Sequence, residues 1–471
     1  MNLKNKTILV WDYGLFTEIA AALIRDFKQV FYYVPWQDAF PSSSKQKIGI
    51  DFKGITRIQN FWEYVDKVDL IASFDTYCGD VVDYLRRKGY RTWGAGEAEA
   101  MELQRWQMRQ EQALKGMATQ ATLRLKSVDD LETYLMGIKN QVEDQFGEKN
   151  GMVINKRLNH LWDKYKGFNE DYFVGGNIDE LIKEFLIGAK KKFVKANMRG
   201  DIETFYVPSY DDSVSKLNSL FETLGHRGDA QETEFVIEEN KEGIEPGFDG
   251  IQVNGQFLNP TAWGFERKGG GYIGKICNYE DLPDFMKSMN AQLSEILKEF
   301  SPTCSFFSTE FIVGSDKKPY LIDPTVRNPA PVGSAIFSEL YRNLGEILYN
   351  GAEGKTTVPE MYPTKYIGGF SCDSEWADKH ELEVEVAPEI DRWVKFRKAY
   401  QKDKKYYALP GFNSICSIIG FGNTVDEVIK VVDQRADKVK AYELQTTHNL
   451  NLIQEDIEKG RELGILTKED F

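Results

Sequence analysis

The segment 308-STEFIVGSDKKPYLIDPTVRNP-329 decides the fold, because it contains two apolar strands joined by a short polar turn. Each strand carries one acid among hydrophobic neighbours, Glu310 in the first and Asp323 in the second. If Val313 pairs with Tyr320, the two carboxylates lie directly opposite each other on one face. Taken alone, the segment is also typical of an ordinary hairpin whose acids face solvent, and a register slip would separate them.

Two carboxylates at that spacing repel each other, so the arrangement needs a cation between them. Hard oxygen ligands beside a phosphate site favour Mg²⁺ over softer metals. The hairpin therefore indicates Glu310 and Asp323 as candidate ligands of a Mg²⁺ ion.

Residues 1–105 alternate apolar, β-rich runs with helical patterns. The run TILVWD begins at Thr7, helical patterns cover 15–27 and 79–88, and the apolar runs QVFYYV and LIASFD separate them. This alternation predicts a parallel sheet with covering helices, which is a Rossmann-like domain. The turn after the first strand, WDYGLF, has a single glycine, and the lack of G-x-G-x-x-G argues against a bound dinucleotide.

Length and composition favour a multidomain enzyme. At roughly 150 residues per domain, the 471 residues predict about three domains. The formal net charge of -14 repels phosphate polyanions over most of the surface, which argues against nucleic acid as a general partner. The five cysteines form no C-x-x-C pair and predict reduced thiols. No stretch approaches the roughly 20 apolar residues of a membrane span, so we expect a cytoplasmic location and no membrane partner.

The later chain contains further strands at informative positions. The strand FVK ends at Lys195, the strand EFVIEE follows, and the glycine-rich segment GFERKGGGYIGKI precedes a long helix at 282–300. The part after residue 351 is β-rich and ends in helices. Residues 140–190 have weak periodicity and several glycines, so we expect an irregular insertion that serves as a substrate or lid element.

The order of these segments resembles that of the ATP-grasp superfamily, and most of all that of enzymes similar to glycinamide ribonucleotide synthetase (phosphoribosylamine–glycine ligase). The resemblance rests on GAGEAEAMELQR, the strand ending in VK, the hinge EFVIEE followed by G-x-E, the basic glycine loop, and the acidic hairpin ending in acid-x-x-x-Arg. It implies an α/β and α+β multidomain fold. The implied parts are a Rossmann-like pre-ATP-grasp domain at 1–105, a small ATP-grasp lobe with the insertion at 106–230, a large lobe at 231–350, and a β-rich accessory domain at 351–471.

The resemblance also implies roles for single residues around ATP. Lys195 and Arg109 would contact its phosphates, and Arg327, with Lys195, would stabilise charge on the γ-phosphate or an acyl phosphate. Glu238 and Glu239 end the hinge strand, where adenine would bond to backbone groups. Glu245 would accept from the ribose hydroxyls. Without the resemblance, these cations are typical of solvated surface residues, and EENKEGIE is typical of an exposed acidic turn.

A basic glycine loop resembles the substrate loop of the family. Arg267, Lys268, Gly269 and Gly270 combine two cations with free backbone N–H groups, which suits an anionic or phosphorylated substrate. On sequence alone the loop is equally compatible with a mobile surface hairpin.

The implied activity is that of a carboxylate–amine ligase that uses ATP and Mg²⁺, forms an acyl phosphate, and releases ADP and phosphate. Its substrates would be a small carboxylic acid and an amine. Two departures from the family pattern leave alternatives open: Thr325 stands where the family has Asn, and residues 196–201 contain one glycine where the family has several. The alternatives are a catalytically idle nucleotide-binding scaffold and an ATP-grasp kinase.

Overall fold

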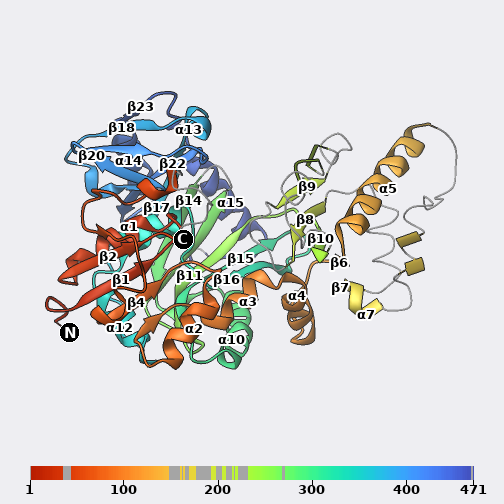
Figure 1. Cartoon of the computed structure of the whole chain (residues 1–471). Helices are drawn as coiled ribbons and strands as arrows, with labels where there is room; N and C mark the ends of the chain where they lie inside the picture. Colours follow the sequence, from red (N-terminus) through yellow and green to blue (C-terminus); the bar gives the residue numbers. More distant parts are fainter. Residues whose placement is uncertain are drawn as a thin grey trace. The chain divides into compact units, whose positions relative to one another are not determined.

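The computed structural model divides into two compact units, which are described separately (Figure 1). Unit 1 comprises Met1–Glu99, Ile244–Phe311 and Pro324–Phe471, and unit 2 comprises Ala100–Gly243 and Ile312–Asp323. The structure describes residues 2–35, 44–147, 160–161, 163–164, 169–176, 192–197, 204–207, 215–216, 218–220, 232–267, 271–467 and 470–471. Most of the expected insertion at 140–190 therefore lies outside the described residues. The four predicted domain ranges stay a prediction.

A five-stranded parallel sheet opens unit 1, in the order β3-β2-β1-β4-β5. Its strands are β1 (Thr7–Trp11), β2 (Gln29–Tyr33), β3 (Thr56–Arg57), β4 (Leu70–Ser73) and β5 (Thr92–Trp93). The helices α1 (Thr17–Ala22) and α2 (Gly79–Arg87) connect strands of this sheet. The predicted Rossmann-like sheet is confirmed. The first helix is shorter than the pattern at 15–27 predicted, because it passes into a 3-10 turn at Leu23–Arg25.

A nine-stranded sheet forms the centre of unit 1, in the order β16-β15-β11-β13-β14-β17-β22-β19, with β12 beside β11. Its strands are β11 (Pro246–Val253), β12 (Gln256–Phe257), β13 (Thr261–Arg267), β14 (Gly271–Cys277), β15 (Cys304–Val313), β16 (Pro319–Thr325), β17 (Tyr366–Asp373), β19 (Val394–Phe396) and β22 (Ser414–Gly422). The predicted acidic hairpin is formed by β15 and β16, whose tip, Ile312–Asp323, belongs to unit 2. The described residues give no register for these two strands, so the opposition of Glu310 and Asp323 stays a prediction.

The hydrophobic core of unit 1 joins both sheets through helices. Ile8 of β1 and Ile19 of α1 belong to the same buried cluster as Phe306 of β15 and Ile336 of α11 (Val332–Leu340). Further helices are α10 (Asp284–Glu299), α12 (Leu344–Gly351), α13 (Trp376–Lys379), α14 (Val425–Ala436) and α15 (Leu450–Glu462). The central sheet and the parallel sheet therefore share one packed core.

The C-terminal part is β-rich and ends in helices, as predicted. A four-stranded antiparallel sheet has the order β20-β21-β18-β23, and strands β17, β19 and β22 extend the central sheet. The small strands are β18 (Leu382–Val386), β20 (Ala399–Lys402), β21 (Lys405–Ala408) and β23 (Val439–Ala441). All five cysteines are free thiols, in agreement with the sequence expectation. No helix of the described residues is long and apolar enough to cross a membrane.

Unit 2 contains a five-stranded antiparallel sheet in the order β7-β6-β10-β8-β9. Its strands are β6 (Thr122–Leu125), β7 (Phe173–Val174), β8 (Lys192–Ala196), β9 (Phe205–Val207) and β10 (Phe235–Glu239), and its helices include α3 (Ala100–Leu103), α4 (Arg105–Leu114), α5 (Val128–Gly147) and α7 (Asn169–Tyr172). Leu123, Val194 and Phe235 pack in its core. Lys195 and Glu238 therefore lie on neighbouring strands.

The start of α14 supplies a test of the fold. The Glu427 N–H donates to the Thr424 hydroxyl at 3.1 Å, and the Glu427 carboxylate accepts from the Asn423 N–H at 2.7 Å. Thr424→Ala removes the first of these bonds, so we expect the free energy of unfolding to fall by about 1 kcal/mol. Urea denaturation measures this change. Thr424→Ser is the control, because it keeps the hydroxyl, and equal losses in both variants would contradict the capping role.

Candidate active site

Four charged side chains meet inside unit 2. The Arg109 Nε donates to Glu238 Oε1 at 2.7 Å, and Lys195 Nζ lies 2.9 Å from Glu238 Oε2. Lys195 Nζ also donates to Asp323 Oδ2 at 3.1 Å, and Arg109 Nη2 lies 3.8 Å from Asp323 Oδ1. The cluster therefore alternates cation and anion, and we call these four residues the charge cluster.

Each member of the charge cluster is placed by a different element. Arg109 comes from α4, Lys195 from β8, Glu238 from β10 and Asp323 from the hairpin tip. Arg109 also donates to the backbone carbonyls of Leu321, at 3.1 Å, and Ile322. Since a buried charge must be paired and hydrogen-bonded, these contacts hold the helix, the sheet and the hairpin tip together.

Burial differs within the cluster. The side chains of Arg109 and Glu238 are 2% and 1% exposed, whereas that of Asp323 is 29% exposed. Burial disfavours the charged form of Asp323, but Lys195, Arg109 and Arg105 outweigh it and lower the pKa of Asp323 to about 2. Burial likewise opposes ionisation of Glu238, and Arg109 and Lys195 reverse the effect and lower its pKa. The part-exposed carboxylate of Asp323 is thus ionised at neutral pH, where it accepts a hydrogen bond from Lys195.

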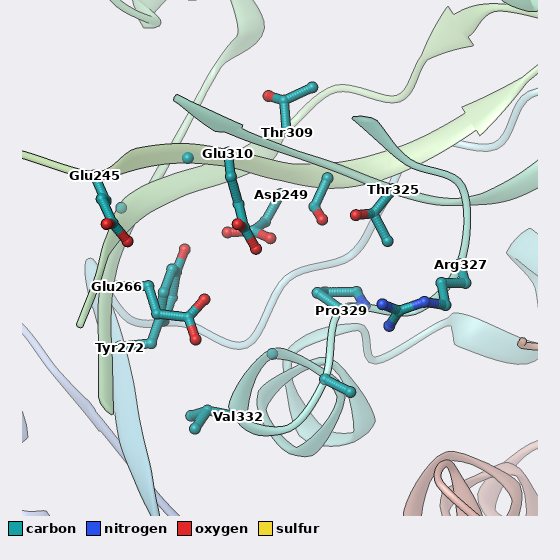
Figure 2. A pocket seen from close by; sticks show the side chains of 15 residues that line it. Glu245, Asp249, Glu266, Tyr272, Thr309, Glu310, Thr325, Arg327, Pro329 and Val332 are labelled. Carbon is teal, nitrogen blue, oxygen red and sulfur yellow. The ribbon is translucent and has the colours of Figure 1, made fainter. Parts of the chain in front are cut away.

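A second polar site lies in unit 1, on the face of the central sheet (Figure 2). Its cavity volume is about 50 Å³. Its ionisable lining residues are Glu245, Asp249, Glu266, Tyr272, Glu310 and Arg327. We call this site the acidic pocket, because the described lining contains four carboxyl groups and one guanidinium.

The strand register explains why these side chains converge. Gly247 of β11 pairs with Glu310 of β15 and with Gly264 of β13, so bare backbone lies beside the Glu310 carboxylate. Residues two apart on a strand share a face, so Asp249 lies on the same face as Gly247. Glu266 pairs with Tyr272 of β14 on that face. The pocket is therefore lined by backbone at Gly247 and Gly264 and by carboxyl side chains around them.

Asp249 is the most deeply buried acid of the pocket. It is 8% exposed, and burial raises the pKa of its carboxyl group to about 7. The Tyr272 hydroxyl interacts with the Asp249 carboxyl group, and this contact opposes the effect of burial on the pKa of Asp249. A buried hydroxyl and a buried carboxyl thus lie together in the lining of the pocket.

The structure brings together some of the predicted site residues. Arg109, Lys195, Glu238 and Asp323 meet in unit 2, and Glu245, Glu310 and Arg327 line the acidic pocket of unit 1. Thr325, which stands at the departure from the family pattern, also lines the pocket.

Other predicted residues lie elsewhere or make other contacts. Glu239 pairs with Lys241 at 2.7 Å, and its N–H donates to the Ala121 carbonyl. Arg267 binds Asp456 of α15 through two nitrogens, with Nη2 to Oδ1 at 2.7 Å. The remaining loop residues, Lys268, Gly269 and Gly270, lie outside the described residues. The role of the loop in substrate binding stays a prediction.

Sequence reasoning missed Asp249, Glu266 and Tyr272. Asp249 lies in the segment PGFDGIQV and Tyr272 in GYIGKIC, and both segments have a residue pattern typical of a strand. Their convergence depends on the pairing of β11, β13 and β14, which no local pattern specifies. A signal was nevertheless present, because Glu245, Gly247 and Asp249 are two residues apart and must share a face.

The donor set fits a Mg²⁺ ion only together with phosphate. Among the described residues, no group of three or more His, Cys, Asp or Glu side chains could hold a metal by itself. Mg²⁺ commonly binds through one or two carboxylates, with substrate phosphates and water completing the shell. An ionised, part-exposed Asp323 beside Lys195 and Arg109 suits that arrangement.

Comparison with known proteins identifies the fold. No protein-family model and no curated protein matches the sequence. Among solved structures, the phosphoribosylamine–glycine ligase of Thermotoga maritima aligns with a TM-score of 0.60 and 13% identity, over 93% of this chain and 98% of that chain. The L-amino acid ligase of Bacillus licheniformis aligns with a TM-score of 0.53 and 12% identity, over 93% and 99%.

A third structure, from Hydrogenobacter thermophilus, aligns over nearly the full length of both chains. It is the biotin carboxylase domain of 2-oxoglutarate carboxylase in complex with MgADP, ADP and bicarbonate, with a TM-score of 0.58 and 11% identity over 98% of this chain and 99% of that chain. All three are ATP-grasp enzymes, so the chain has the ATP-grasp fold that its sequence resembles.

The buried Asp249 gives a pH test of the pocket. An unfolded Asp ionises near its ordinary pKa of 3.8, while folding raises the pKa to about 7. Between these values the folded protein binds more protons, so this group lowers stability as pH rises. Relative to wild type, Asp249→Asn should gain on the order of 4 kcal/mol in unfolding free energy between pH 4 and pH 8.

Urea denaturation at pH 4, 6 and 8 measures this difference. Asp284→Asn is the control, because the Asp284 side chain is 99% exposed. The control should follow the wild-type pH dependence. Parallel curves for wild type and Asp249→Asn would show that the Asp249 carboxyl is not held in its neutral form by burial.

Proposed function

We propose that this chain is an ATP-dependent carboxylate–amine ligase that forms an amide through an acyl phosphate and releases ADP and phosphate. The observation that carries the proposal is the charge cluster, in which two buried cations stand beside an ionised, part-exposed aspartate. Cations and a metal-binding carboxylate are what phosphoryl transfer requires, since its catalysis is mainly positioning and charge stabilisation. The ATP-grasp fold supports the same proposal.

The charge cluster would bind the phosphates of ATP. Lys195 Nζ already lies within 3.1 Å of two carboxylates, so it is held in place before a phosphate oxygen arrives. Arg109 is buried and donates to Glu238 and to the Leu321 carbonyl. Its guanidinium group would therefore contribute to phosphate binding mainly by holding Glu238, Lys195 and Asp323 in position. Glu238 would serve through this cluster, while Glu239 remains the proposed site of adenine and Glu245 that of ribose.

Glu310 and Asp323 would hold Mg²⁺, which supplies a charge that neutralises the phosphate oxygens during transfer. Arg327, at the edge of the acidic pocket, would stabilise the negative charge of the acyl phosphate. The proposed substrate loop, with Arg267, Lys268, Gly269 and Gly270, would bind an anionic group of the acid substrate. Arg267 is paired with Asp456, so it would have to release the Asp456 carboxylate before it could bind the anionic group of the substrate.

The reaction proceeds in two balanced steps. A carboxylate oxygen of the acid attacks the γ-phosphorus of ATP, and the bond to the β-phosphate oxygen breaks, which gives an acyl phosphate and ADP. A neutral amine then attacks the carbonyl carbon, the bond from carbon to the phosphate oxygen breaks, and the amine releases one proton. Two donors, Arg327 and Lys195, supply fixed positive charge for these steps.

The metal ligands give the first test of the activity. Asp323→Asn and Glu310→Gln keep side-chain size but remove charge, so we expect each to abolish ADP formation and stabilisation by MgATP. Coupled assays of ADP and thermal unfolding with MgATP measure the two effects. The control is Asp316→Asn on the exposed turn of the same hairpin, which should keep both. Turnover at the wild-type rate in Asp323→Asn would remove it from the metal site.

Arg327 gives the second test. Its guanidinium would act on charge that develops in the transition state, so Arg327→Ala should lower kcat by roughly 10²- to 10³-fold, with a smaller change in the KM for ATP. Arg342→Ala, on an exposed arginine, is the control. Mass spectrometry of the products separates ligase from kinase, because a kinase yields a phosphorylated acid and no amide. An unchanged kcat in Arg327→Ala would exclude the assigned role.

A further inference from the structure

Glu18 is a buried acid that contacts the wall of the acidic pocket through one serine. It lies in α1 and is 3% exposed, and its Oε1 atom lies 2.5 Å from the Oγ atom of Ser334, the third residue of α11. The Ser334 N–H donates to the Pro329 carbonyl at 2.6 Å. Pro329 and Val332 line the acidic pocket, and Figure 2 shows them across the pocket from Glu310. Glu18 therefore acts on the pocket wall from behind it.

The Ser334 hydroxyl has two acceptors within reach but a single proton to donate. The second acceptor is the carbonyl of Pro331, which directly precedes α11 and lies 3.2 Å from the Ser334 oxygen. When Glu18 is ionised, both neighbours are acceptors, and the hydroxyl satisfies only one of them. When Glu18 is protonated, its O–H donates to the Ser334 oxygen, and the Ser334 hydroxyl donates to Pro331. The complete chain of hydrogen bonds therefore requires the neutral acid.

The surroundings of Glu18 also favour its neutral form. Burial has the largest effect and raises the pKa of Glu18 to about 7, although the charge of Arg397 and the bond to Ser334 oppose it. Lys395 likewise favours the ionised form, whereas Asp12 disfavours it. The Glu18 Oε2 atom has no hydrogen-bond partner among the described residues. Further ionisable groups on neighbouring elements are paired with one another: Arg25, Arg392 and Lys395 with Glu339, and Tyr32 with Asp12.

Resting on the proposed ligase function, we propose that Glu18 is a positioning residue that makes the acidic pocket sensitive to pH: its protonated form holds the first turn of α11, and its ionised form releases that turn. A local opening that hydrates the carboxyl returns its pKa from about 7 to the ordinary 4.5. Opening then releases a proton and becomes easier as the pH rises between these two values. Arg327 lies two residues before Pro329, so the release extends to the segment that carries the proposed catalytic guanidinium.

Hydrogen exchange of the full chain, followed by mass spectrometry at pH 5 and pH 8, tests the proposal without any ligand. The reference is Glu18→Gln, which is neutral at both pH values and shares the intrinsic pH dependence of amide exchange. Between pH 5 and pH 8, exchange of the segment 329–340 should accelerate at least about tenfold more in the wild type than in Glu18→Gln. The helix α14 is the control segment, and its exchange should change equally in both proteins.

Matched variants keep the result interpretable. Glu97→Gln changes an exposed glutamate of unit 1 and should follow the wild type at both pH values. Ser334→Ala removes the hydroxyl from the chain of hydrogen bonds, so exchange of 329–340 should already be faster than in the wild type at pH 5. Circular dichroism confirms that each variant is folded. Equal pH dependence of 329–340 in the wild type and Glu18→Gln would overturn the proposal. An equal acceleration in α14 would also overturn it, because that result indicates global unfolding and not release of one turn.

Activity assays with MgATP and panels of carboxylic acids and amines separate this inference from the proposed function. For an acid that is turned over, kcat/KM should fall in the wild type relative to Glu18→Gln as the pH rises from 5 to 8. If ADP and amide form while exchange of 329–340 is insensitive to Glu18, the chain is a ligase and the role assigned to Glu18 is wrong. If exchange follows the prediction but no acid supports ADP formation, the role of Glu18 is correct and the ligase assignment is wrong.

Discussion

The architecture of unit 2 depends on the charge cluster, in which the positive charges of Arg109 and Lys195 neutralise the negative charges of Glu238 and Asp323. Removing one partner from such a buried group leaves a charge without compensation, at a cost of about 3–5 kcal/mol. The four residues come from a helix, two sheet strands and the hairpin tip, so their pairing fixes where that tip lies within the unit. The same contacts hold the Lys195 ammonium group in place and lower the pKa of Asp323. The same ion pairs therefore stabilise unit 2 and position the residues proposed to act in catalysis.

The central sheet of unit 1 gathers several acidic side chains on one face. Gly247 and Gly264 leave backbone without side chains beside Glu310, while Asp249 and Tyr272 are buried next to that space. A sheet supplies this geometry because alternate residues of neighbouring strands face the same side at fixed spacing. A rigid face of this kind holds polar groups ready for a ligand, which reduces the cost of ordering them on binding.

Much of the fold was predictable from local patterns. The parallel sheet follows from apolar runs that alternate with helical ones, and the hairpin of β15 and β16 follows from two apolar strands around the polar turn GSDKK. The segment GAGEAEAMELQR is harder to assign, because it contains a 3-10 turn and the short helix α3, and Gln104, whose backbone leaves the helical region, separates α3 from α4. Arg109 was predicted to bind phosphate directly, but the sequence contains no sign that it would be buried against the carbonyls of Leu321 and Ile322. The acids of the pocket required knowledge of strand register, which is set by long-range pairing.

The transfer of carboxylate oxygen to phosphate tests the central claim most directly. The protein is incubated with MgATP, a panel of amines and a panel of carboxylic acids labelled with ¹⁸O, and the released phosphate is analysed by mass spectrometry. A ligase that forms an acyl phosphate places one ¹⁸O from the acid in the phosphate, together with one equivalent each of ADP and amide. Phosphate whose oxygens come only from ATP and water, with no amide formed from any acid of the panel, would contradict the account.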